Sequence, residues 1–389
     1  MNILKNNRPT SSNSKITIKE YKINERITES ENNIFTEIIK MDIVYLIGDE
    51  FYNKSFLIKY PFTTFVYSSL SAVGTYNKEV YVYESILSEM NRILDHEISP
   101  HVYIVANREI LILQDLSYFG FQTKNNRKQL TLQESKIALK TLAKFHAASY
   151  KLNLQNTNLF NKEFKGISNI LNIVVEIIEI WLPIISAVLE KENFLPQQIQ
   201  KLSSFSEKFV EKFTAIFEGF DTEFSVLNHG DFRTTNILLK YNDQGDPIEA
   251  KLIDYQLCHW TSPAYDIIYF FVSSLPFDIF EKHSEDLYDT YLKTLNKTLI
   301  KLNCQYQYQK TELKNSIDKM KLFYLPCFLL LGILIGDLNC FNFNLSCMKG
   351  NSKKNDISLT DMIDKIHNDE LFRTSLHKWF QYFVTNEII

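Results

Sequence analysis

The sequence predicts an α+β fold, with a small β-rich region followed by a larger and mainly helical one. In roughly the first third of the chain, short runs rich in β-branched and aromatic residues surround a single helical segment. Beyond Asp115, apolar residues recur at helical spacing, and one β-rich island at residues 224–257 interrupts them. The chain has 389 residues, of which 45% are hydrophobic. That length and apolar content are ample for two lobes with buried cores.

The first region should contain a small sheet. Strands are expected at 34–45 and 56–60, a helix at 80–94, and two strands within 102–113 that turn at Asn107 and Arg108. The chain begins with the polar segment MNILKNNRPTSSNSK, which lacks the apolar stretch of a signal peptide. We therefore expect a disordered tail over residues 1–19 and a first lobe over residues 20–115.

The second region, residues 116–389, should be mainly helical. Thr131 and Glu134 are spaced as a capping box, in which each side chain accepts a hydrogen bond from the other's backbone N–H, so a helix should begin there. Further long helices are expected at 168–190, 197–218, 279–302, 312–337 and 370–385. Inside the island, strands are expected at 224–227, 236–239 and 250–253.

Composition excludes several classes of protein. A net charge of −4 provides no basic field for nucleic acid or an anionic membrane. Five cysteines without a CxxC spacing indicate neither a disulfide framework nor a zinc site, and they favour a reducing, cytoplasmic setting. The strongest apolar run, residues 322–336, contains Pro326 and is short for a membrane span, so it should be a buried helix. We expect a monomer.

The island carries the polar residues that point to chemistry. Asp231 and Asn236 lie five residues apart on a predicted loop, and Asp254 follows the next strand. Phosphoryl transfer needs a carboxylate to orient the attacking hydroxyl and oxygen ligands to hold Mg²⁺ on the phosphates. These three residues have the types and the order for both tasks. Alternatively, Asp231 and Asn236 are turn residues that satisfy their own backbone, and Asp254 is an ordinary acid at a strand end.

The pattern H-G-D-x4-N followed by Ile253-Asp-Tyr-Gln256 resembles the aminoglycoside and choline phosphotransferases, which share the protein-kinase fold. More narrowly, the sequence resembles the insect ecdysteroid-kinase-like family, also called choline-kinase-like. Four further segments match in that family's order: residues 56–59 (FLIK), 76–83 (YNKEVYVY), 113–117 (LQDLS) and 142–149 (LAKFHAAS). The tripeptide HGD alone would mean little, whereas the ordered set over residues 30–270 is specific.

The resemblance implies a protein-kinase-like, two-lobed fold, with nucleotide bound by residues 20–115. Residues 116–389 would carry the catalytic loop and an acceptor pocket built partly by residues 150–225. The implied activity is that of an ATP- and Mg²⁺-dependent kinase. Its acceptor would be a hydroxyl group of an ecdysteroid-like or other small hydroxylated molecule, whose identity no motif encodes.

The resemblance also assigns roles in the second lobe, at matching positions only. Asp231 would be the catalytic base, and Asn236 and Asp254 would be the Mg²⁺ ligands. Asp266 would accept hydrogen bonds from the backbone of the catalytic loop. Arg233 lies close enough in sequence to reach the γ-phosphate, but it would equally suit a surface position.

In the first lobe, Lys59 would hold the α- and β-phosphates and Glu79 would pair with it, while the backbone of Gln114 to Leu116 would meet adenine. Taken alone, Lys59 is a solvent-facing strand residue and Glu79 part of a solvated helix face. His229 and His146 are expected to brace the structure by packing and hydrogen bonding rather than to act in catalysis.

Two other functions are possible in principle, and the sequence favours or disfavours each by a particular feature. The stretch over the phosphates, residues 29–36, has no glycine. That departure motivates a pseudokinase that binds nucleotide or ligand without turnover. A protein kinase is disfavoured because the sequence has Ile253-Asp-Tyr-Gln in place of D-F-G and no A-P-E element. Too few residues separate Asp254 from Asp266 for a peptide-docking loop.

Overall fold

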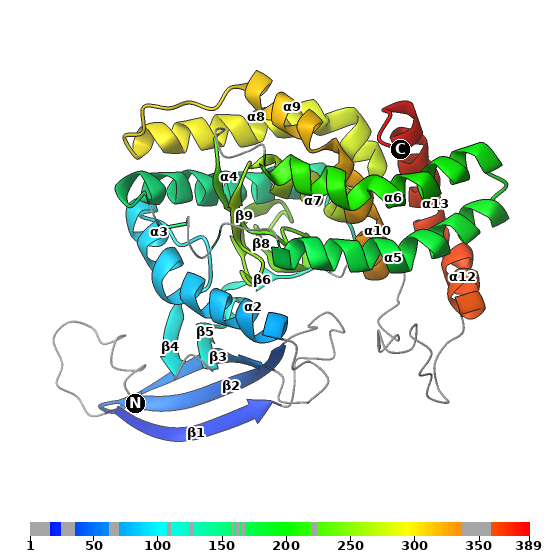
Figure 1. The fold of residues 1–389 in the computed structure, drawn as a ribbon. Helices are drawn as coiled ribbons and strands as arrows, with labels where there is room; N and C mark the ends of the chain where they lie inside the picture. Colours follow the sequence, from blue (N-terminus) through cyan, green and yellow to red (C-terminus); the bar gives the residue numbers. More distant parts are fainter. Residues whose placement is uncertain are drawn as a thin grey trace. The chain divides into compact units, whose positions relative to one another are not determined.

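The computed structural model describes residues 16–24, 36–61, 70–106, 110–124, 128–157, 159–160, 164, 168–218, 224–335 and 359–389. Their contacts divide the chain into two compact units, drawn in Figure 1. Unit 1 comprises Met1–Gln122 with Leu238–Leu257, and unit 2 comprises Thr123–Ile237 with Cys258–Ile389. Residues 238–257, which we assigned to the second lobe, therefore cluster with unit 1.

Unit 1 contains an antiparallel five-stranded sheet in the order β1-β2-β3-β5-β4 (Figure 1). Its strands are β1 (Ile16–Asn24), β2 (Thr36–Ile47), β3 (Glu50–Pro61), β4 (Val102–Ala106) and β5 (Ile110–Gln114). Ile47 pairs with Glu50, so Gly48 and Asp49 form a two-residue hairpin turn. Gly48 has a φ of 65°, a conformation that such turns require and that glycine adopts at little cost.

Three helical segments follow β3 in unit 1. They are α2 (Leu70–Tyr81), a π-helical turn η3 (Val82–Ile86) and α3 (Leu87–Leu94). After β5 come the 3₁₀ helix η4 (Leu116–Phe119) and strand β6 (Phe121–Gln122). Strands β8 (Ile237–Tyr241) and β9 (Pro247–Leu252) complete a second sheet in the order β6-β8-β9.

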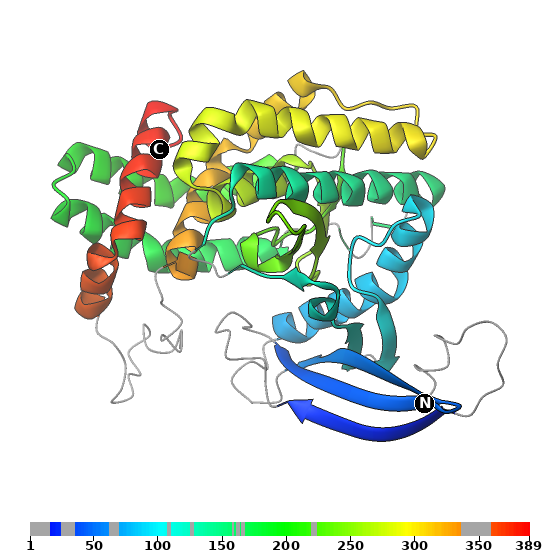
Figure 2. The ribbon, with the colours of Figure 1, turned by 180° about the vertical axis from the view of Figure 1, so that it is seen from behind.

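Unit 2 is built mainly from helices. Its elements are α4 (Leu132–Gln155), α5 (Ser168–Lys191), α6 (Pro196–Glu218), β7 (Val226–Asn228), η5 (Thr234–Asn236), β10 (His259–Thr261), α7 (Ala264–Ser274), α8 (Phe277–Lys301), α9 (Lys310–Lys319), η6 (Lys321–Phe323), α10 (Tyr324–Ile335), α12 (Leu359–Asn368) and α13 (Glu370–Thr385). Helices α4 and α8 lie side by side in both Figure 1 and Figure 2. The capping box of Thr131 and Glu134 is present at the start of α4, as predicted.

The predicted fold class is confirmed, but the structure departs from three of the expected element bounds. Residues 16–19 were expected in a disordered tail, yet they belong to β1. A bulge between Ile18 and Glu20 shifts the register of β1 against β2, which breaks the two-residue alternation that would have revealed the strand. The helix expected at 80–94 is the end of a longer helical stretch that begins at Leu70.

The third departure concerns the helix expected over 312–337, which is divided into α9, η6 and α10. Pro326 explains the division, because proline lacks the backbone N–H for an i−4 bond and its ring clashes with the preceding turn. The break therefore falls just before it. Helix α12 had no counterpart among the predicted elements, and the turn expected at Asn107 and Arg108 lies outside the described residues.

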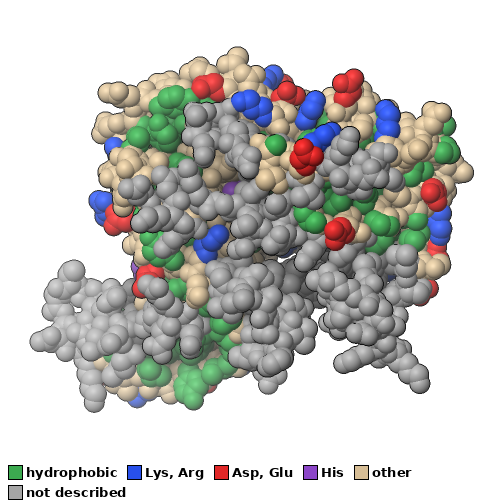
Figure 3. Space-filling view, in the orientation of Figure 1, with side chains coloured by type: hydrophobic (Ala, Val, Ile, Leu, Met, Phe, Trp, Pro, Cys, Tyr) green, Lys and Arg blue, Asp and Glu red, His purple; other side chains and the backbone are tan. Residues whose placement is uncertain are grey.

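Apolar residues of α10 are buried, as expected for the 322–336 run. Leu325, Phe328 and Leu329 are each at most 2% exposed. In the part of the chain that the structure describes, no helix combines the length and the apolar content needed to span a bilayer. On the face shown in Figure 3, the described acidic and basic side chains are dispersed rather than gathered by sign.

Candidate active site

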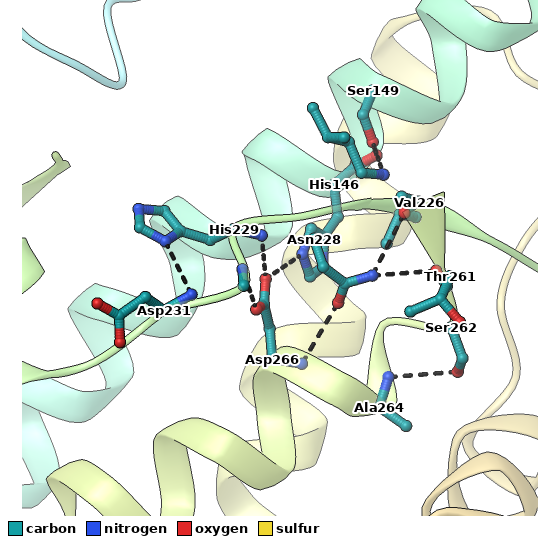
Figure 4. A network of polar contacts seen from close by, with 12 residues as sticks. His146, Ser149, Val226, Asn228, His229, Asp231, Thr261, Ser262, Ala264 and Asp266 are labelled. Carbon is teal, nitrogen blue, oxygen red and sulfur yellow. Dashed lines mark hydrogen bonds and ion pairs between the residues drawn. The ribbon is translucent and has the colours of Figure 1, made fainter. Parts of the chain in front are cut away.

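The loop after β7 is held by a buried carboxylate. Asp266, on α7, accepts a hydrogen bond from the backbone N–H of His229 (2.6 Å), as Figure 4 shows. It also accepts one from the backbone N–H of Gly230 (3.0 Å). Gly230 has a φ of 84°, which lets the chain turn sharply there. Both backbone N–H groups donate to the same carboxylate, which fixes the position of the first residues of the loop. The predicted structural task of Asp266 is confirmed.

A histidine supports that carboxylate. Nε2 of His146, on α4, lies 3.1 Å from Oδ2 of Asp266, and its Nδ1 lies 2.9 Å from the hydroxyl of Tyr291. Although burial opposes ionisation, contacts with His146 and the loop hold the pKa of Asp266 below its ordinary value. Burial lowers the pKa of His146, despite Asp266 beside it. The prediction that His146 is a satisfied core residue is therefore confirmed.

Asp231, the predicted base, lies in the same loop and is almost fully buried. Its Oδ1 accepts from Nε of Arg233 (3.0 Å) and from the hydroxyl of Tyr269 (2.5 Å). Its Oδ2 accepts from Nδ2 of Asn236 (2.8 Å). Burial alone would raise the pKa of Asp231, but Arg233 and Tyr269 outweigh it and lower that pKa. The carboxylate is therefore held ionised and in one orientation.

Asn236 is oriented by the same contacts. Its Nδ2 donates both to the backbone oxygen of Asp231 (2.9 Å) and to the Asp231 carboxylate. Since the amide nitrogen faces Asp231, the amide oxygen Oδ1 is directed away from it. An oxygen fixed in this way is the donor type that Mg²⁺ prefers. Arg233, for which we considered a γ-phosphate contact, is 7% exposed and is engaged through Nε with Asp231.

In unit 1, the structure brings together Lys59, Glu79 and Asp254. Nζ of Lys59 donates to Oε1 of Glu79 (2.7 Å) and to Oδ1 of Asp254 (2.8 Å). Lys59 is 5% exposed and Glu79 fully buried, so neither has the solvent-facing position of the alternative reading. Burial opposes the charge of Lys59, but the two carboxylates together raise its pKa. Burial raises the pKa of Glu79.

Asp254 adopts an uncommon backbone conformation, with a φ of 71°. Non-glycine residues rarely take this conformation unless their surroundings impose it. The next residue, Tyr255, packs edge-on against Tyr83, with ring centroids 5.3 Å apart. Tyr83 lies in the π-helical turn η3, an irregularity that is frequent at functional sites. The sequence analysis missed this contact, because helical periodicity alone does not reveal a π turn.

The predicted adenine contact, residues 114–116, lies at the end of β5 and the start of η4. The carboxylate of Asp115, in the middle of this segment, accepts hydrogen bonds from Lys40 (2.7 Å), from Ser55 (2.8 Å) and from the backbone N–H of Ser117 (2.9 Å). These contacts tie the segment to β2 and β3. Leu116 is the first residue of η4, so its backbone N–H is among those that have no acceptor within the helix.

Six of the eight predicted site residues therefore form two groups, which Gln114 and Leu116 do not join. Asp231, Arg233 and Asn236 are in direct contact in unit 2, and Lys59, Glu79 and Asp254 are in direct contact in unit 1. Tyr269 was missed, and the only available signal was its position one helical turn after Asp266. Of the glycine-free stretch 29–36, residues 29–35 lie outside the described residues, and Thr36 begins β2.

Among the described residues, no group of three or more His, Cys, Asp or Glu side chains could hold a metal ion. Mg²⁺ usually takes only one or two protein oxygens and completes its shell with water and phosphate. The cluster in unit 1 contains one cation, Lys59, and two carboxylates, Glu79 and Asp254. The carboxylate oxygens of Asp254 are of the type that a divalent cation binds.

Comparison with known proteins identifies the family. The sequence profile of the ecdysteroid kinase-like family matches residues 30–304. The chain belongs to the ecdysteroid kinase-like family. This confirms the predicted resemblance and, with the β-rich and helical parts described above, the protein-kinase-like fold. The chain is thus a relative of small-molecule phosphotransferases. No protein of curated function matches it in sequence.

Several solved structures are similar to the chain. Choline kinase from Cryptosporidium parvum is 14% identical, with a TM-score of 0.47, and the match covers 96% of this chain and 91% of that one. A choline/ethanolamine kinase family protein from Mesorhizobium loti is 14% identical, with a TM-score of 0.42 and coverage of 87% and 90%. The GDP complex of an aminoglycoside 2′-phosphotransferase is 11% identical, with a TM-score of 0.40 and coverage of 95% and 94%. We draw no inference about substrate from likenesses at this level.

Proposed function

We propose that the protein is an ATP- and Mg²⁺-dependent kinase that phosphorylates a hydroxyl group of a small, ecdysteroid-like or otherwise hydroxylated molecule. The observation that carries the proposal is the Asp231 carboxylate, buried, ionised and oriented by Arg233, Tyr269 and Asn236. A carboxylate in this state orients an attacking hydroxyl and accepts its proton, which is the task of the base in phosphoryl transfer. Family membership supports the same reading.

Each remaining residue has a proposed task. Asn236 and Asp254 are the proposed Mg²⁺ ligands, and Lys59, held by Glu79, is the proposed contact of the nucleotide phosphates. Bound Mg²⁺ would neutralise charge on the phosphates. The backbone of Gln114 and Leu116 is the proposed contact of adenine.

The acceptor pocket was predicted to use residues 150–225. Within unit 2, a cavity of about 600 Å³ is lined by Tyr150 and Phe224 from this segment, together with Tyr306 and Tyr308. Its size suits a small-molecule ligand. A second cavity in unit 2, of about 940 Å³, lies among residues of α8, α9 and α13. Asp231 lines neither cavity, and the position of the acceptor stays a prediction.

We also propose a monomer in a reducing, cytoplasmic compartment. Among the described residues, Cys304 and Cys327 are buried free thiols, which fits reducing conditions. The oligomeric state is measurable by sedimentation of the purified chain.

The test is ATP consumption by the purified protein with Mg²⁺, across ecdysteroids, choline, ethanolamine, phenols and glycosides. Turnover that depends on one acceptor class and falls by about two to four orders of magnitude in Asp231→Asn would support the kinase and name its substrate class. Tight Mg²⁺-ATP binding without transfer to any acceptor or to water would favour the pseudokinase alternative.

A further inference from the structure

We propose that Tyr269 is a positioning residue, whose hydroxyl determines which oxygen of Asp231 receives the acceptor hydroxyl. The inference rests on the proposed kinase activity. Tyr269 lies on α7, is 5% exposed and donates to Oδ1 of Asp231 at 2.5 Å. Neither the sequence motif nor the family's assigned roles include it.

Helix α7 holds the catalytic loop at successive points. Asp266 accepts from the backbone at His229 and Gly230, Tyr269 donates to the Asp231 side chain, and Oγ of Ser274 accepts from the backbone N–H of Thr234 (3.0 Å). Residues three and four apart on a helix share one face, so Asp266 and Tyr269 both face the loop. Three of these four hydrogen bonds fix the backbone, whereas the one from Tyr269 reaches the reactive side chain.

The contacts of Asp231 leave one direction open. A carboxylate has about four acceptor positions, two on each oxygen. Arg233 and Tyr269 occupy the two positions of Oδ1, at 3.0 and 2.5 Å. Asn236 occupies one position of Oδ2, at 2.8 Å, and Nε of Arg233 makes only a longer contact of 3.3 Å there. The remaining position for an acceptor hydroxyl is therefore on Oδ2.

This assignment specifies the path of the proton. In the transfer, the acceptor oxygen forms a bond to the γ-phosphorus while the bond from that phosphorus to the bridging oxygen breaks, leaving its electrons on ADP. The hydroxyl proton passes to Oδ2 of Asp231 and then to solvent. Without the phenol hydroxyl, Oδ1 gains a free position. The acceptor then binds in a second, unproductive orientation.

The first test is Tyr269→Phe, which removes one oxygen and keeps the ring. We expect kcat to fall ~10- to 100-fold, the range for losing one hydrogen bond to a charged group, with KM for Mg²⁺-ATP unchanged within about twofold. The matched control is Tyr265→Phe, on the same helix. Tyr265 is 3% exposed and stacks on Phe323 at 4.3 Å. The Tyr265→Phe variant should retain wild-type kcat, and thermal unfolding of both variants reports any loss of fold.

The second test separates positioning from a purely structural role. If Tyr269 acts through Asp231, Tyr269→Phe should change the residual turnover of Asp231→Asn by less than about twofold. The assay uses the acceptor found in the panel, or water where none is found. A Tyr269→Phe enzyme with wild-type kcat would overturn the positioning role of Tyr269 but not the proposed kinase activity. The same holds if Tyr269→Phe reduces the turnover of Asp231→Asn as much as it reduces that of the wild type. A wild-type protein that transfers phosphate to nothing would instead overturn the proposed function.

Discussion

The loop of unit 2 and the ion cluster of unit 1 satisfy their buried carboxylates differently. In unit 2, both oxygens of Asp231 and both oxygens of Asp266 accept hydrogen bonds, and the pKa of each carboxyl is lowered. In unit 1, Glu79 is fully buried, burial raises its pKa, and among the described residues its Oε2 has no hydrogen-bond partner.

The difference indicates what each part has to do. A carboxylate that accepts hydrogen bonds on both oxygens is held in one orientation before any ligand binds. A general base needs such an orientation, because it must be aligned with the acceptor hydroxyl. A cluster in which one buried carboxylate oxygen has no hydrogen-bond partner is less completely organised by its own contacts. We therefore expect changes in the unit 2 loop to reduce turnover or stability, and changes in the unit 1 cluster to reduce nucleotide binding.

The largest effect should come from Asp231→Asn. Turnover should fall by about two to four orders of magnitude, the range for losing a general base, while ATP affinity is spared. Single-turnover kinetics and equilibrium ATP binding measure the two quantities separately. Near-normal turnover would remove Asp231 as the base, and a parallel loss of ATP affinity would break the division between the two regions.

Asp266→Asn should destabilise the fold. The change removes the negative charge that faces His146 and two backbone N–H groups, all of them buried. Asn keeps only one acceptor oxygen, so at least one of these buried donors loses its partner, which typically costs about 1–3 kcal/mol, and more for a group bonded to a charge, as denaturant unfolding would measure. The control is Asp278→Asn, because Asp278 pairs with Lys378 at the surface and such pairs contribute at most about 1 kcal/mol. Equal effects from both variants would contradict the structural role of Asp266.

Asp254→Ala should weaken Mg²⁺-dependent nucleotide binding at least about tenfold, a conservative figure for the loss of a metal ligand. Lys59 keeps Glu79 as its partner, so the fold should survive. Titration of ATP with and without Mg²⁺ measures the effect. Asp243→Ala, an exposed acid of the same unit, should bind as the wild type does. A variant with unchanged Mg²⁺ dependence would exclude Asp254 from the metal site.

The smallest effect concerns pH. Burial lowers the pKa of His146, so in the folded protein it stays neutral at pH values where the unfolded chain, with the ordinary pKa of 6.5, takes up a proton. The unfolded state then binds more protons, and stability is lost as pH falls from about 6.5. The contribution is about 1.4 kcal/mol per unit of pKa difference.

His146→Gln should therefore flatten the dependence of unfolding free energy on pH between about 5 and 7. Urea unfolding at several pH values measures the slope. An unchanged slope in His146→Gln would show that another group titrates in this range.

Local signals predicted much of the fold. The capping box at Thr131 depends on residues three apart, and strands β2 and β3 on short runs of β-branched and aromatic residues. The departures arose where a neighbour changed the local pattern. A bulge shifted the phase of β1, and Pro326 interrupted a periodicity that otherwise continued through residues 312–337.

The sequence by itself determined the loop that carries Asp231 and Asn236, because five residues on one tight turn place the two side chains in contact. It also determined the family. Only the tertiary structure decided which groups surround these residues. Tyr269 meets Asp231 across 38 positions, His146 meets Asp266 across 120, and Lys59 meets Asp254 across 195. Such contacts depend on how helices and strands pack, and no short pattern encodes that packing.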